Sequence, residues 1–489
     1  MSFNKSCRMA VLVGISAGSI VTALAQNITG PSSSESPYLV RTEPGVVTVS
    51  ILTVGDAVNN KADGTTPYRL VGIPDGLGAF DNEDGTFTLL VNHEFAGTSA
   101  RPVGIVRDHG FAGSFVSKWI IDKATLTVLH GEDLMKNVHA WNTNTCTYVP
   151  LAGPILRLCA ADLPPVSAFY NPATGSGYNG RIYMNGEETG SEGRNFAHLL
   201  DGNSYDLPRL GKFSHENSVA HPSTGDKTVV VGLDDTSPRG QVYIYVGTKT
   251  TSSNPIEAAG LSNGDLYGIK VVGFTNEIFA TGIPSGTPFT AYNFGDVSCE
   301  TGSKLDADSV ANGVTGFWRP EDGCWDPMHP NDFYFVTTAS FTGTSRLWRL
   351  RFIDPADPVA GGTIDMLLDG TEGHRMLDNI TVTDRGDVIA QEDVGEQDHI
   401  GKVWRYNIAT DTLEMVAQHD PDRFTPGAPN FLTNDEESSG VIPMDSILGE
   451  GWYLLDVQAH YATDTELVEG GQLVALHLPP GRPPVRGKK

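Results

Sequence analysis

Six short apolar stretches, most of them followed at once by acidic residues, constrain this 489-residue chain more than any other feature. Five are TFTLLVNHE ending at Glu94, GRIYMNGEE at Glu188, KTVVVGLDD at Asp235, GDVIAQED at Asp393 and GWYLLDVQAH passing through Asp456. The sixth, NDFYFVTTAS, is the same kind of stretch without the acid. β-Branched and aromatic residues are frequent in these stretches and helical periodicity is scarce, so we predict an all-β protein.

A second type of strand follows several of these stretches and indicates how they are arranged. Its examples are SFVSKWIID from Ser114, GQVYIYVG from Gly240, SRLWRLRFID from Ser345, GKVWRYNIATDTL from Gly401 and GQLVALHLPP from Gly471. Irregular repeats of two or more strands, about 40 to 100 residues apart, are typical of propeller blades. We therefore predict a β-propeller, six-bladed with long insertions. A pair of β-sandwiches or an irregular all-β protein is the alternative.

The two ends of the chain differ from its middle. Lys5 and Arg8 precede an apolar run that ends in Ala23-Leu24-Ala25, a pattern typical of a cleavable signal for general secretion to the periplasm or the medium. The predicted parts are a signal peptide over residues 1–25, a polar N-terminal segment over 26–45, a single propeller domain over 46–480 and a basic tail over 481–489. No second run approaches the roughly 18 apolar residues of a membrane span, so none is expected. The oligomeric state stays open.

The charge of the chain excludes some partners. The formal charge is −26 at pH 7, and removal of Lys5 and Arg8 with the signal would make it more negative. Such a field repels nucleic acid and anionic lipid, so we expect no nucleic-acid partner. Bound cations would fit this balance, and acids spread over the surface for solubility would fit it as well.

Four cysteines remain once the predicted signal is removed: Cys146, Cys159, Cys299 and Cys324. An even number in an oxidising compartment predicts two disulfides. Of the three possible pairings, the most local joins Cys146 to Cys159 and Cys299 to Cys324.

Acids at equivalent strand ends of a propeller would converge at one mouth of its channel. The residues concerned are Glu94, Glu187 or Glu188, Asp234 or Asp235, and Glu392 or Asp393. Several carboxylates in one place cannot all stay ionised without a cation between them. Oxygen ligands from separate elements suit Ca²⁺, which accepts irregular coordination by about six to eight oxygens. We predict a calcium site in the channel, and a solvated acidic face is the alternative for any one of these residues.

The stretch WRPEDGCWDP from Trp318 places a cation beside carboxylates. Pro320 favours an extended conformation of Arg319, and alternate side chains of an extended chain share a face, so Arg319 and Glu321 should point the same way. A guanidinium fork suits two phosphate oxygens, and a carboxylate suits a metal bound to the same phosphate. The alternative is a plain ion pair beside a turn.

Six ordered motifs resemble the PhoX-type alkaline phosphatases. They are NHE from Asn92, GEE from Gly186, GKFSHEN from Gly211, GLDD with GQVYIYV from Gly232, RPEDG from Arg319 and LDNITVTDRGDVIAQED from Leu377. The resemblance implies a six-bladed propeller with calcium and iron in its channel that hydrolyses phosphate monoesters outside the cytoplasm. It implies metal ligands at Glu94, Glu188, Glu216 and Asp235, a metal-bridging carboxylate at Glu321, a phosphate clamp at Arg319 and a further candidate ligand at Asp378. Glu187 and Asp393 stay candidate ligands through their places at strand ends.

Two features depart from this family. It has a cysteine ligand to iron upstream of the NHE strand, but VGIPDGLGAF from Val71 contains no cysteine, so calcium is expected first and Fe³⁺ second. Its frequent twin-arginine signal is also absent. We predict a secreted metal-dependent phosphatase with Arg319 and Glu321 as catalytic residues and a small phosphate ester as substrate. A non-catalytic calcium-binding propeller that binds a surface partner and a calcium lactonase-like hydrolase are the alternatives.

Overall fold

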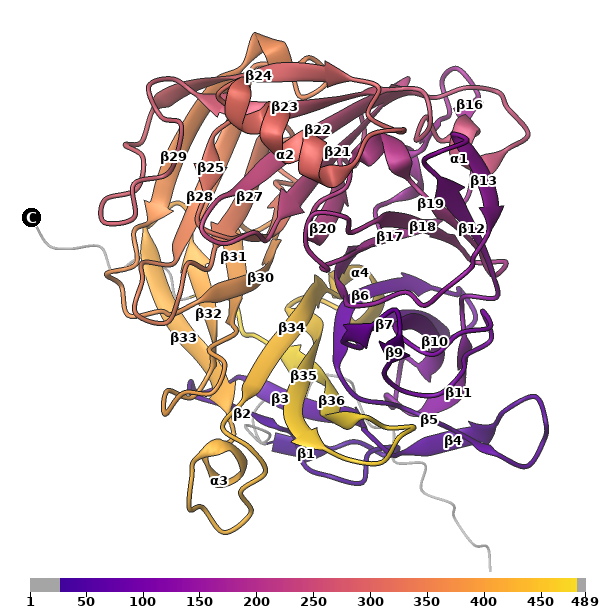
Figure 1. The fold of residues 1–489 in the computed structure, drawn as a ribbon. Coiled ribbons are helices and arrows are strands. Elements are labelled where there is room, and N and C mark those ends of the chain that lie inside the picture. The colour runs from indigo at the N-terminus through magenta and orange to yellow at the C-terminus, as the bar shows by residue number, and fades with distance from the viewer. Residues whose placement is uncertain (1–26, 482–489) are drawn as a thin grey trace, which may run out of the picture.

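The computed structural model describes residues 27–481, and its main sheets are arranged as six blades around one channel (Figure 1). The predicted all-β propeller is confirmed. The innermost strands are β6 (Pro74–Asp81), β14 (Leu158–Asp162), β20 (His215–Ala220), β26 (Pro320–Trp325), β30 (Leu377–Val382) and β34 (Glu436–Pro443). Each contacts the next and β34 contacts β6, so the ring is closed. The signal peptide predicted over 1–25 and the tail after Gly481 lie outside the described residues.

Each inner strand is followed outwards by antiparallel partners. Blade 1 continues with β7 (Thr86–His93), β10 (Phe115–Asp122) and β11 (Val128–Asp133), and blade 2 with β17 (Ile182–Glu187), β18 (Asn195–Leu199), β19 (Asn203–Asp206), β12 (Asn137–Asn142) and β13 (Thr147–Pro150). Blade 3 continues with β21 (Lys227–Asp234), β22 (Gly240–Thr248), β23 (Asp265–Val271) and β24 (Thr287–Gly295), and blade 4 with β27 (Asp332–Thr337), β28 (Arg346–Phe352) and β29 (Gly362–Leu368). Only one pair in this set is parallel, β12 with β19.

Strands from both ends of the chain complete the last two blades. Blade 5 consists of β30, β31 (Asp387–Glu392), β32 (Lys402–Asn407), β33 (Thr412–His419) and β2 (Leu39–Arg41), and blade 6 of β34, β35 (Trp452–Ala462), β36 (Glu469–His477), β3 (Val47–Thr53) and β1 (Asn27–Thr29). The pairing of β3 with β36 joins the beginning of the chain to its end. The segment 26–45, expected to precede the propeller, thus supplies β1 and β2 to its sheets.

The remaining elements are short and lie in the connections. They are the strands β4 (Ala57–Asn60), β5 (Pro67–Arg69), β8 (Gly97–Thr98), β9 (Arg101–Pro102), β15 (Tyr170–Asn171), β16 (Ser176–Gly177) and β25 (Gly316–Phe317), the helices α1 (Pro255–Ala258), α2 (Gly302–Ala311), α3 (Pro421–Phe424) and α4 (Asp445–Leu448), and three single 3₁₀ turns (Val166–Ala168, Pro208–Leu210, Pro358–Ala360). Within residues 27–481, none of the helices has the length and apolar character that a membrane crossing needs.

The hydrophobic core is divided among the blade interfaces. Buried apolar side chains of the described residues form six clusters, and each cluster joins two neighbouring blades. Trp119 of blade 1, for example, shares a cluster with Leu454 of blade 6. Burial of such side chains stabilises by roughly 1.5 to 3 kcal/mol each. Strands such as β21 have near-continuous buried runs because both faces of each blade pack against a neighbour.

Two-residue bulges interrupt the inner strands at a repeated place. In blade 1 the pairing of β6 with β7 shifts between Pro74 and Leu77, so two residues of β6 lie opposite one of β7. The same shift occurs in blades 2 to 5. In blade 6 it lies further along, after Ser439. A bulge turns a side chain away from the regular alternation of a strand, and here it does so at equivalent points around the channel.

The predicted disulfides are wrong in both pairings. Cys146 is bonded to Cys299, whereas Cys159 and Cys324 have free thiols. Cys146 lies in the outer hairpin of blade 2 between β12 and β13, and Cys299 lies in the connection between β24 and α2. Cys159 and Cys324 belong to the inner strands β14 and β26 instead. The blade architecture therefore separates cysteines that are close in sequence and brings together two that are 153 residues apart.

Removal of the disulfide should destabilise the protein without affecting the two free thiols. We expect Cys299→Ser to lower the free energy of unfolding by about 2 to 4 kcal/mol, because a cross-link between distant positions restricts the unfolded chain. Denaturant unfolding measures this, with Cys324→Ser as the matched control that breaks no cross-link. A peptide map that finds Cys159 or Cys324 in a disulfide would contradict the assignment.

Candidate metal centre in the channel

The bulges bring five buried side chains together inside the ring, and the regular part of β34 in blade 6 adds a sixth. The first residue of each bulge in blades 1 to 5, and the residue of the same register in blade 6, are Asp75, Cys159, Glu216, Glu321, Asp378 and Glu437. All are at most 9% exposed. Each blade thus contributes one potential ligand from its inner strand, and five of these six residues are carboxylates.

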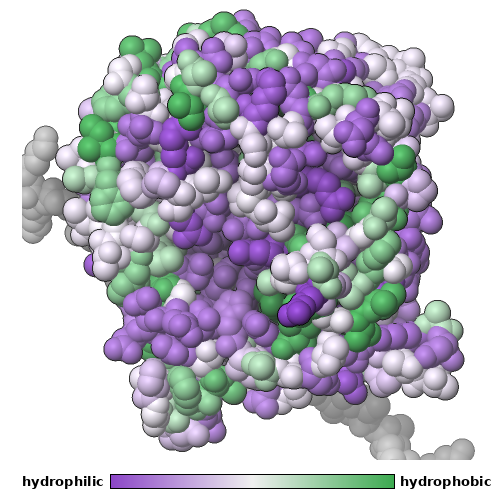
Figure 2. Space-filling view, viewed as in Figure 1, coloured by the Kyte–Doolittle hydropathy of each residue, from purple (hydrophilic) through white to green (hydrophobic). Residues whose placement is uncertain are grey.

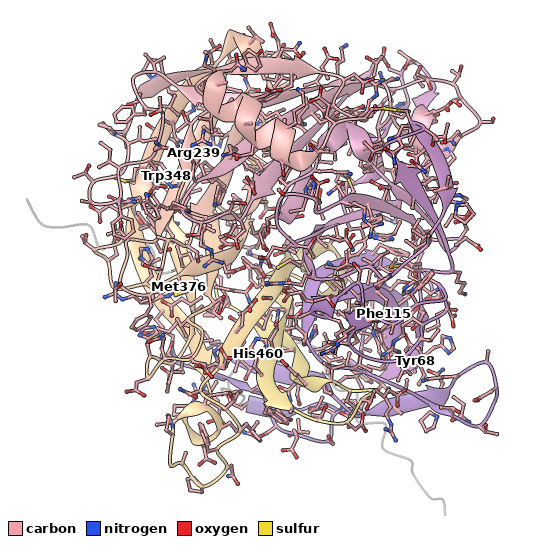
Figure 3. All side chains as sticks on the ribbon, viewed as in Figure 1. Tyr68, Phe115, Arg239, Trp348, Met376 and His460 are labelled. Atoms are coloured by element: carbon pink, nitrogen blue, oxygen red, sulfur yellow. A yellow bond between two sulfur atoms is a disulfide. The ribbon has the colours of Figure 1, made fainter. Side chains whose placement is uncertain are left out.

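A second ring comes from the residue that directly follows the second strand in blades 1 to 5 and from the residue of the same register within β35 in blade 6. Its members are Glu94, Glu188, Asp235, Thr338, Asp393 and His460. Each backbone N–H donates to a carbonyl at the start of the neighbouring inner strand, over 2.8 to 3.1 Å. Figure 3 shows His460 in blade 6 and Met376, whose carbonyl accepts from Asp393 N–H in blade 5. The repeat explains why the acid is missing from NDFYFVTTAS, since Thr338 occupies that place.

The residues that directly precede this ring make other contacts. Glu187 accepts two hydrogen bonds from Arg194, at 2.6 and 2.8 Å. Asp234 accepts from Thr236 Oγ1 at 2.6 Å, and Glu392 accepts from Trp404 Nε1 at 2.8 Å. Of each pair of neighbouring acids in the sequence, the structure therefore places the second one in the ring. Glu187 lies apart from the cluster.

Three groups of potential ligands lie close enough together to share cations. They are Asp75, Glu94 and Cys159; Cys159, Glu188 and Glu216; and Glu216, Glu321 and Asp378. Within each group the ligand atoms lie within 4.8 Å of one another. Two oxygens on opposite sides of Ca²⁺ are about 5 Å apart, because each Ca–O bond is roughly 2.4 Å. The groups share Cys159 and Glu216, so they form one continuous cluster across blades 1 to 5.

Burial and mutual repulsion favour the protonated forms of this cluster. Burial raises the pKa of Asp75 well above its usual range, and the carboxylate of Glu94 raises it further. The pKa of Glu216 is raised by burial and then by Asp378. Burial likewise raises the pKa of the Cys159 thiol, with Asp75 as the next cause. A cation between these groups would reverse the preference, because it stabilises their charged forms.

Two arginines neutralise part of the cluster from opposite ends. Arg319 donates from Nε and Nη2 to the two oxygens of Asp235, at 2.7 and 2.8 Å, and its Nη2 lies 3.0 Å from Glu321 Oε1. Arg157 donates from Nε to Glu94 Oε1 at 2.7 Å and forms an ion pair with Glu188. The predicted neighbourhood of Arg319 and Glu321 is therefore present. Arg157 has no counterpart in the sequence predictions.

The backbone of Arg319 differs from the expected extended form. Its φ is +60°, in the left-handed region that is uncommon for residues other than glycine. The carbonyls of Trp318 and Arg319 accept hydrogen bonds from Ala339 and Thr338, at 3.0 and 3.1 Å. These two bonds hold the turn against the bias of the following proline. The expectation from Pro320 is wrong, although the Arg319 side chain still reaches Glu321.

Several oxygens of the cluster have no donor among the described residues. Glu216 Oε1 and Asp378 Oδ1 are buried without a hydrogen-bond partner, and so are both carboxylate oxygens of Asp456, which lies in β35 and whose charge acts on Asp75. Unpaired buried acceptors are destabilising by about 1 to 3 kcal/mol each, and a bound cation would satisfy them. Carboxylates suit calcium, whereas a thiolate among them suits a softer transition metal such as iron. The donor set therefore fits both metals that the sequence analysis named.

Sequence reasoning missed several members of the site. Cys159 was assigned to a disulfide, and Asp75 lies in the stretch that was searched only for cysteine. Gln458 was also missed; its Nε2 lies 3.0 Å from Asp75 Oδ2 and 3.3 Å from both Glu94 Oε2 and Glu437 Oε1. A signal for Asp75 does exist, because Ile73-Pro74-Asp75-Gly76 resembles Arg319-Pro320-Glu321-Asp322.

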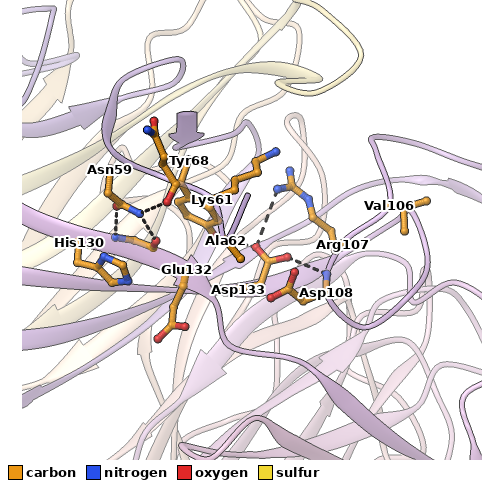
Figure 4. A pocket seen from close by; sticks show the side chains of 12 residues that line it. Asn59, Lys61, Ala62, Tyr68, Val106, Arg107, Asp108, His130, Glu132 and Asp133 are labelled. Atoms are coloured by element: carbon orange, nitrogen blue, oxygen red, sulfur yellow. Dashed lines mark hydrogen bonds and ion pairs between the residues drawn. The ribbon is translucent and has the colours of Figure 1, made fainter. Parts of the chain in front are cut away.

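The centre lies beside a cavity at the mouth of the channel. This cavity of about 940 Å³ is lined by Arg157, Glu188, Ser214 and parts of blades 1 and 2. Figure 2 shows hydrophilic residues around a hollow on the face viewed. Another cavity, of about 250 Å³, lies between β11 and the β4–β5 hairpin on the outside of blade 1 (Figure 4). Its lining includes Arg107 and Asp133 and none of the channel ligands.

Comparison with known proteins supports the fold. No protein-family model and no curated protein sequence matches the chain. Among solved structures, Pseudomonas fluorescens PhoX in complex with vanadate, a transition state analogue, matches with a TM-score of 0.64 and 12% identity over 89% of this chain and 95% of that one. An α-L-arabinofuranosidase from Podospora anserina matches with a TM-score of 0.33 and 8% identity, over 88% and 96% of the two chains. The chain therefore has a PhoX-like fold.

Metal removal should destabilise the protein, and more so at high pH. Without metal, raised carboxyl pKa values mean that the folded cluster holds protons that the unfolded chain releases above about pH 5. The folded state then binds more protons than the unfolded state, so the free energy of unfolding falls as the pH rises from about 5 to 8. We expect chelator-treated protein to melt at a lower temperature at pH 8 than at pH 5.

Added Ca²⁺ should restore the melting temperature, with about 3 kcal/mol of stabilisation at 100 times its Kd. Differential scanning calorimetry across this pH range, with and without chelator, measures both effects. Melting temperatures that respond to neither chelator nor Ca²⁺ would contradict a metal site in the channel.

Proposed function

We propose that the protein is a metal-dependent phosphatase that hydrolyses phosphate monoesters at the mouth of its propeller channel. The observation that carries the proposal is the contact of Arg319 with Asp235 and Glu321, at the edge of the buried cluster. It combines a guanidinium fork with carboxylates that are within reach of a cation. An ester with a small alcohol group is the expected substrate, because the cluster itself is buried.

The comparison structure supports the same substrate class. That protein binds vanadate as a transition state analogue, and its backbone matches most of this chain. With 12% identity the match extends to the fold alone. The chemistry of the proposal therefore depends on the residues of this channel. Arg319 and the acids of the two rings are the residues that suit a phosphoryl group.

The residues divide into metal-holding and substrate-holding groups. Glu94, Glu188, Glu216, Glu321 and Asp378 would hold calcium, as expected from the sequence. Asp235, which the resemblance also named as a ligand, would instead hold Arg319. When bound, such cations offset the negative charge of the phosphoryl group in the transition state. Nε and Nη2 of Arg319 face Asp235 and Glu321, so its Nη1 group would donate to phosphate oxygens, and Asp235, which is 5% exposed at its side chain, fixes the plane of the guanidinium.

Iron is proposed for the part of the cluster that includes Cys159. This thiol belongs to two of the three ligand groups, with carboxylates as the other members. A thiolate is a poor ligand for calcium and a good one for transition metals. The cysteine that was expected upstream of Asn92 is thus supplied from β14 instead. Asp393 and Glu437 lie on neighbouring strands joined by an isolated bridge and would extend the calcium-binding part.

Export to an oxidising compartment is part of the proposal. The disulfide between Cys146 and Cys299 is typical of proteins that fold outside the cytoplasm. The N-terminal signal pattern points to the periplasm or the medium.

Substitution of Arg319 by lysine tests the phosphate clamp. Lysine keeps the charge but cannot form the fork, so we expect Arg319→Lys to reduce kcat/KM for a chromogenic phosphate monoester on the order of 100-fold with metal content unchanged. Glu321→Gln should lose both metal and activity, because it removes a ligand charge. Elemental analysis, calorimetry and steady-state kinetics measure the three quantities.

The matched control is Arg349→Lys, which alters a similar fork in the same blade. Arg349 lies on β28, the third strand of blade 4, and donates from Nε and Nη2 to Asp365 Oδ2 on β29. Its activity should equal that of the unaltered protein. Equal activity of Arg319→Lys and the unaltered protein would refute the clamp, and a protein that hydrolyses no phosphate monoester would refute the proposed function.

Substitution of Cys159 by serine tests the iron site. We expect Cys159→Ser to lose most of its iron and to keep most of its calcium, because a hydroxyl is a weaker ligand for iron than a thiolate. Elemental analysis of purified protein gives both contents, and the loss of any thiolate-to-iron absorption band gives a second measure. Cys324→Ser, at the other free thiol, is the control. Equal iron content in the two variants would contradict the assignment.

A further inference from the structure

We propose that Arg157 forms a second anion-binding site at the channel mouth. This site would take a carboxylate or other oxyanion group carried by the alcohol part of the substrate. The inference depends on the proposed phosphatase function and narrows its substrate class to phosphate esters with a second negative group. Arg319 would hold the phosphate, and Arg157 would hold the second group.

The blade repeat places Arg157 and Arg319 at equivalent positions. Each lies two residues before the first bulge residue of its inner strand, Cys159 in blade 2 and Glu321 in blade 4. Each carbonyl accepts a hydrogen bond from the residue after the second strand, Glu188 or Thr338. The equivalent residues of the other blades are Ile73, Ser214, Met376 and Asp435, none of which is a cation.

The two arginines also share an uncommon backbone conformation. The φ angle is +44° for Arg157 and +60° for Arg319. A positive φ in a residue with a side chain costs about 1 to 2 kcal/mol, so a fold keeps it where the surroundings hold it. Ile73 and Met376 have the same feature, at +49° and +38°. The repeat thus directs the residue at this position to the same rim of the channel.

The two carboxylates that contact Arg157 are candidate metal ligands. Its guanidinium contacts Glu94 and Glu188, and each of these belongs to one of the three ligand groups. Once cations share the charge of these carboxylates, the guanidinium keeps its own charge with less compensation. It is then free to attract another anion.

The surroundings leave Arg157 accessible from the mouth. Its side chain is 43% exposed, compared with 25% for Arg319. It lines the cavity of about 940 Å³ together with Glu188, so the same group faces both the cluster and the cavity. The other arginine of this cavity, Arg194, is held by both oxygens of Glu187. Arg157 is therefore the cation that a group in this cavity can reach.

A matched pair of substrates tests the site. 3-Phosphoglycerate and glycerol 3-phosphate have the same phosphate ester, but only the first has a carboxylate. We expect the metal-loaded protein to prefer 3-phosphoglycerate by about tenfold or more in kcat/KM, the effect of one charge-assisted pair. Arg157→Gln should reduce this ratio to about one; the ratio is the readout, because loss of the cation beside Glu94 and Glu188 would change the rates with both esters alike. Arg157→Lys should keep part of the preference.

The control variant is Arg351→Gln, which removes an arginine of similar exposure elsewhere. Arg351 is 50% exposed and donates to both oxygens of Asp332 on blade 4. It should retain the ratio of the unaltered protein. Calorimetric binding of the phosphonate analogues of the two esters, which are not hydrolysed, gives a readout that needs no turnover. Arg157→Gln should weaken binding of the carboxylate-bearing analogue about tenfold or more and should not alter that of the other.

The outcomes separate the two proposals. If the unaltered protein hydrolyses neither ester, the phosphatase proposal fails, and the binding of the analogues still decides the role of Arg157. If it hydrolyses both but Arg157→Gln lowers both rates equally, together with metal content, then Arg157 only neutralises Glu94 and Glu188 and the inference is wrong. Equal binding of the two analogues by the unaltered protein would also overturn it.

Discussion

The repulsion among buried carboxylates is the constraint on which the rest of the channel depends. Each blade alone could tolerate its acid, but the ring brings those of Asp75, Glu216, Glu321 and Asp378 together where water cannot screen them. Three side chains offset this repulsion: Gln458 donates a hydrogen bond, and Arg157 and Arg319 form ion pairs with the carboxylates. These groups offset only part of the charge. Carboxylates whose charge is only partly offset are suited to binding metal ions.

The bulges explain how an ordinary blade can supply such a centre. A regular inner strand would alternate its side chains between the two adjoining blade interfaces, where the apolar clusters lie. The extra residue at Asp75, for example, points a carboxylate into the channel while Leu77 returns to the core. The blade interfaces require apolar side chains and the channel requires polar ones. The bulge allows one short strand to supply both kinds.

Much of the fold could be predicted from the sequence, because short apolar strands recur in every blade and strand-end acids recur in blades 1, 2, 3 and 5. The second ring followed from the same pattern, and the backbone bonds to the inner strands then distinguish Glu188 from Glu187. The first ring was harder to find, since Cys159 and Asp75 each stand in a different motif and only the bulge makes them equivalent. The predicted cysteine pairing was wrong for a related reason. Distance along the chain does not show which connections of neighbouring blades lie side by side, and Cys146 and Cys299 lie in two such connections.

The pairing of β3 with β36 determines when the channel can close during synthesis and folding of the chain. Blade 6 needs strands from both ends of the sequence, and its Gln458 contacts Asp75 and Glu94 of blade 1. A chain synthesised only as far as residue 389 has the inner-strand ligands of blades 1 to 5 but lacks β34 of blade 6, so the ring around them is still open. The cluster is therefore enclosed only after blade 6 has been synthesised, and a cation held by all six blades would be captured after the ring has closed.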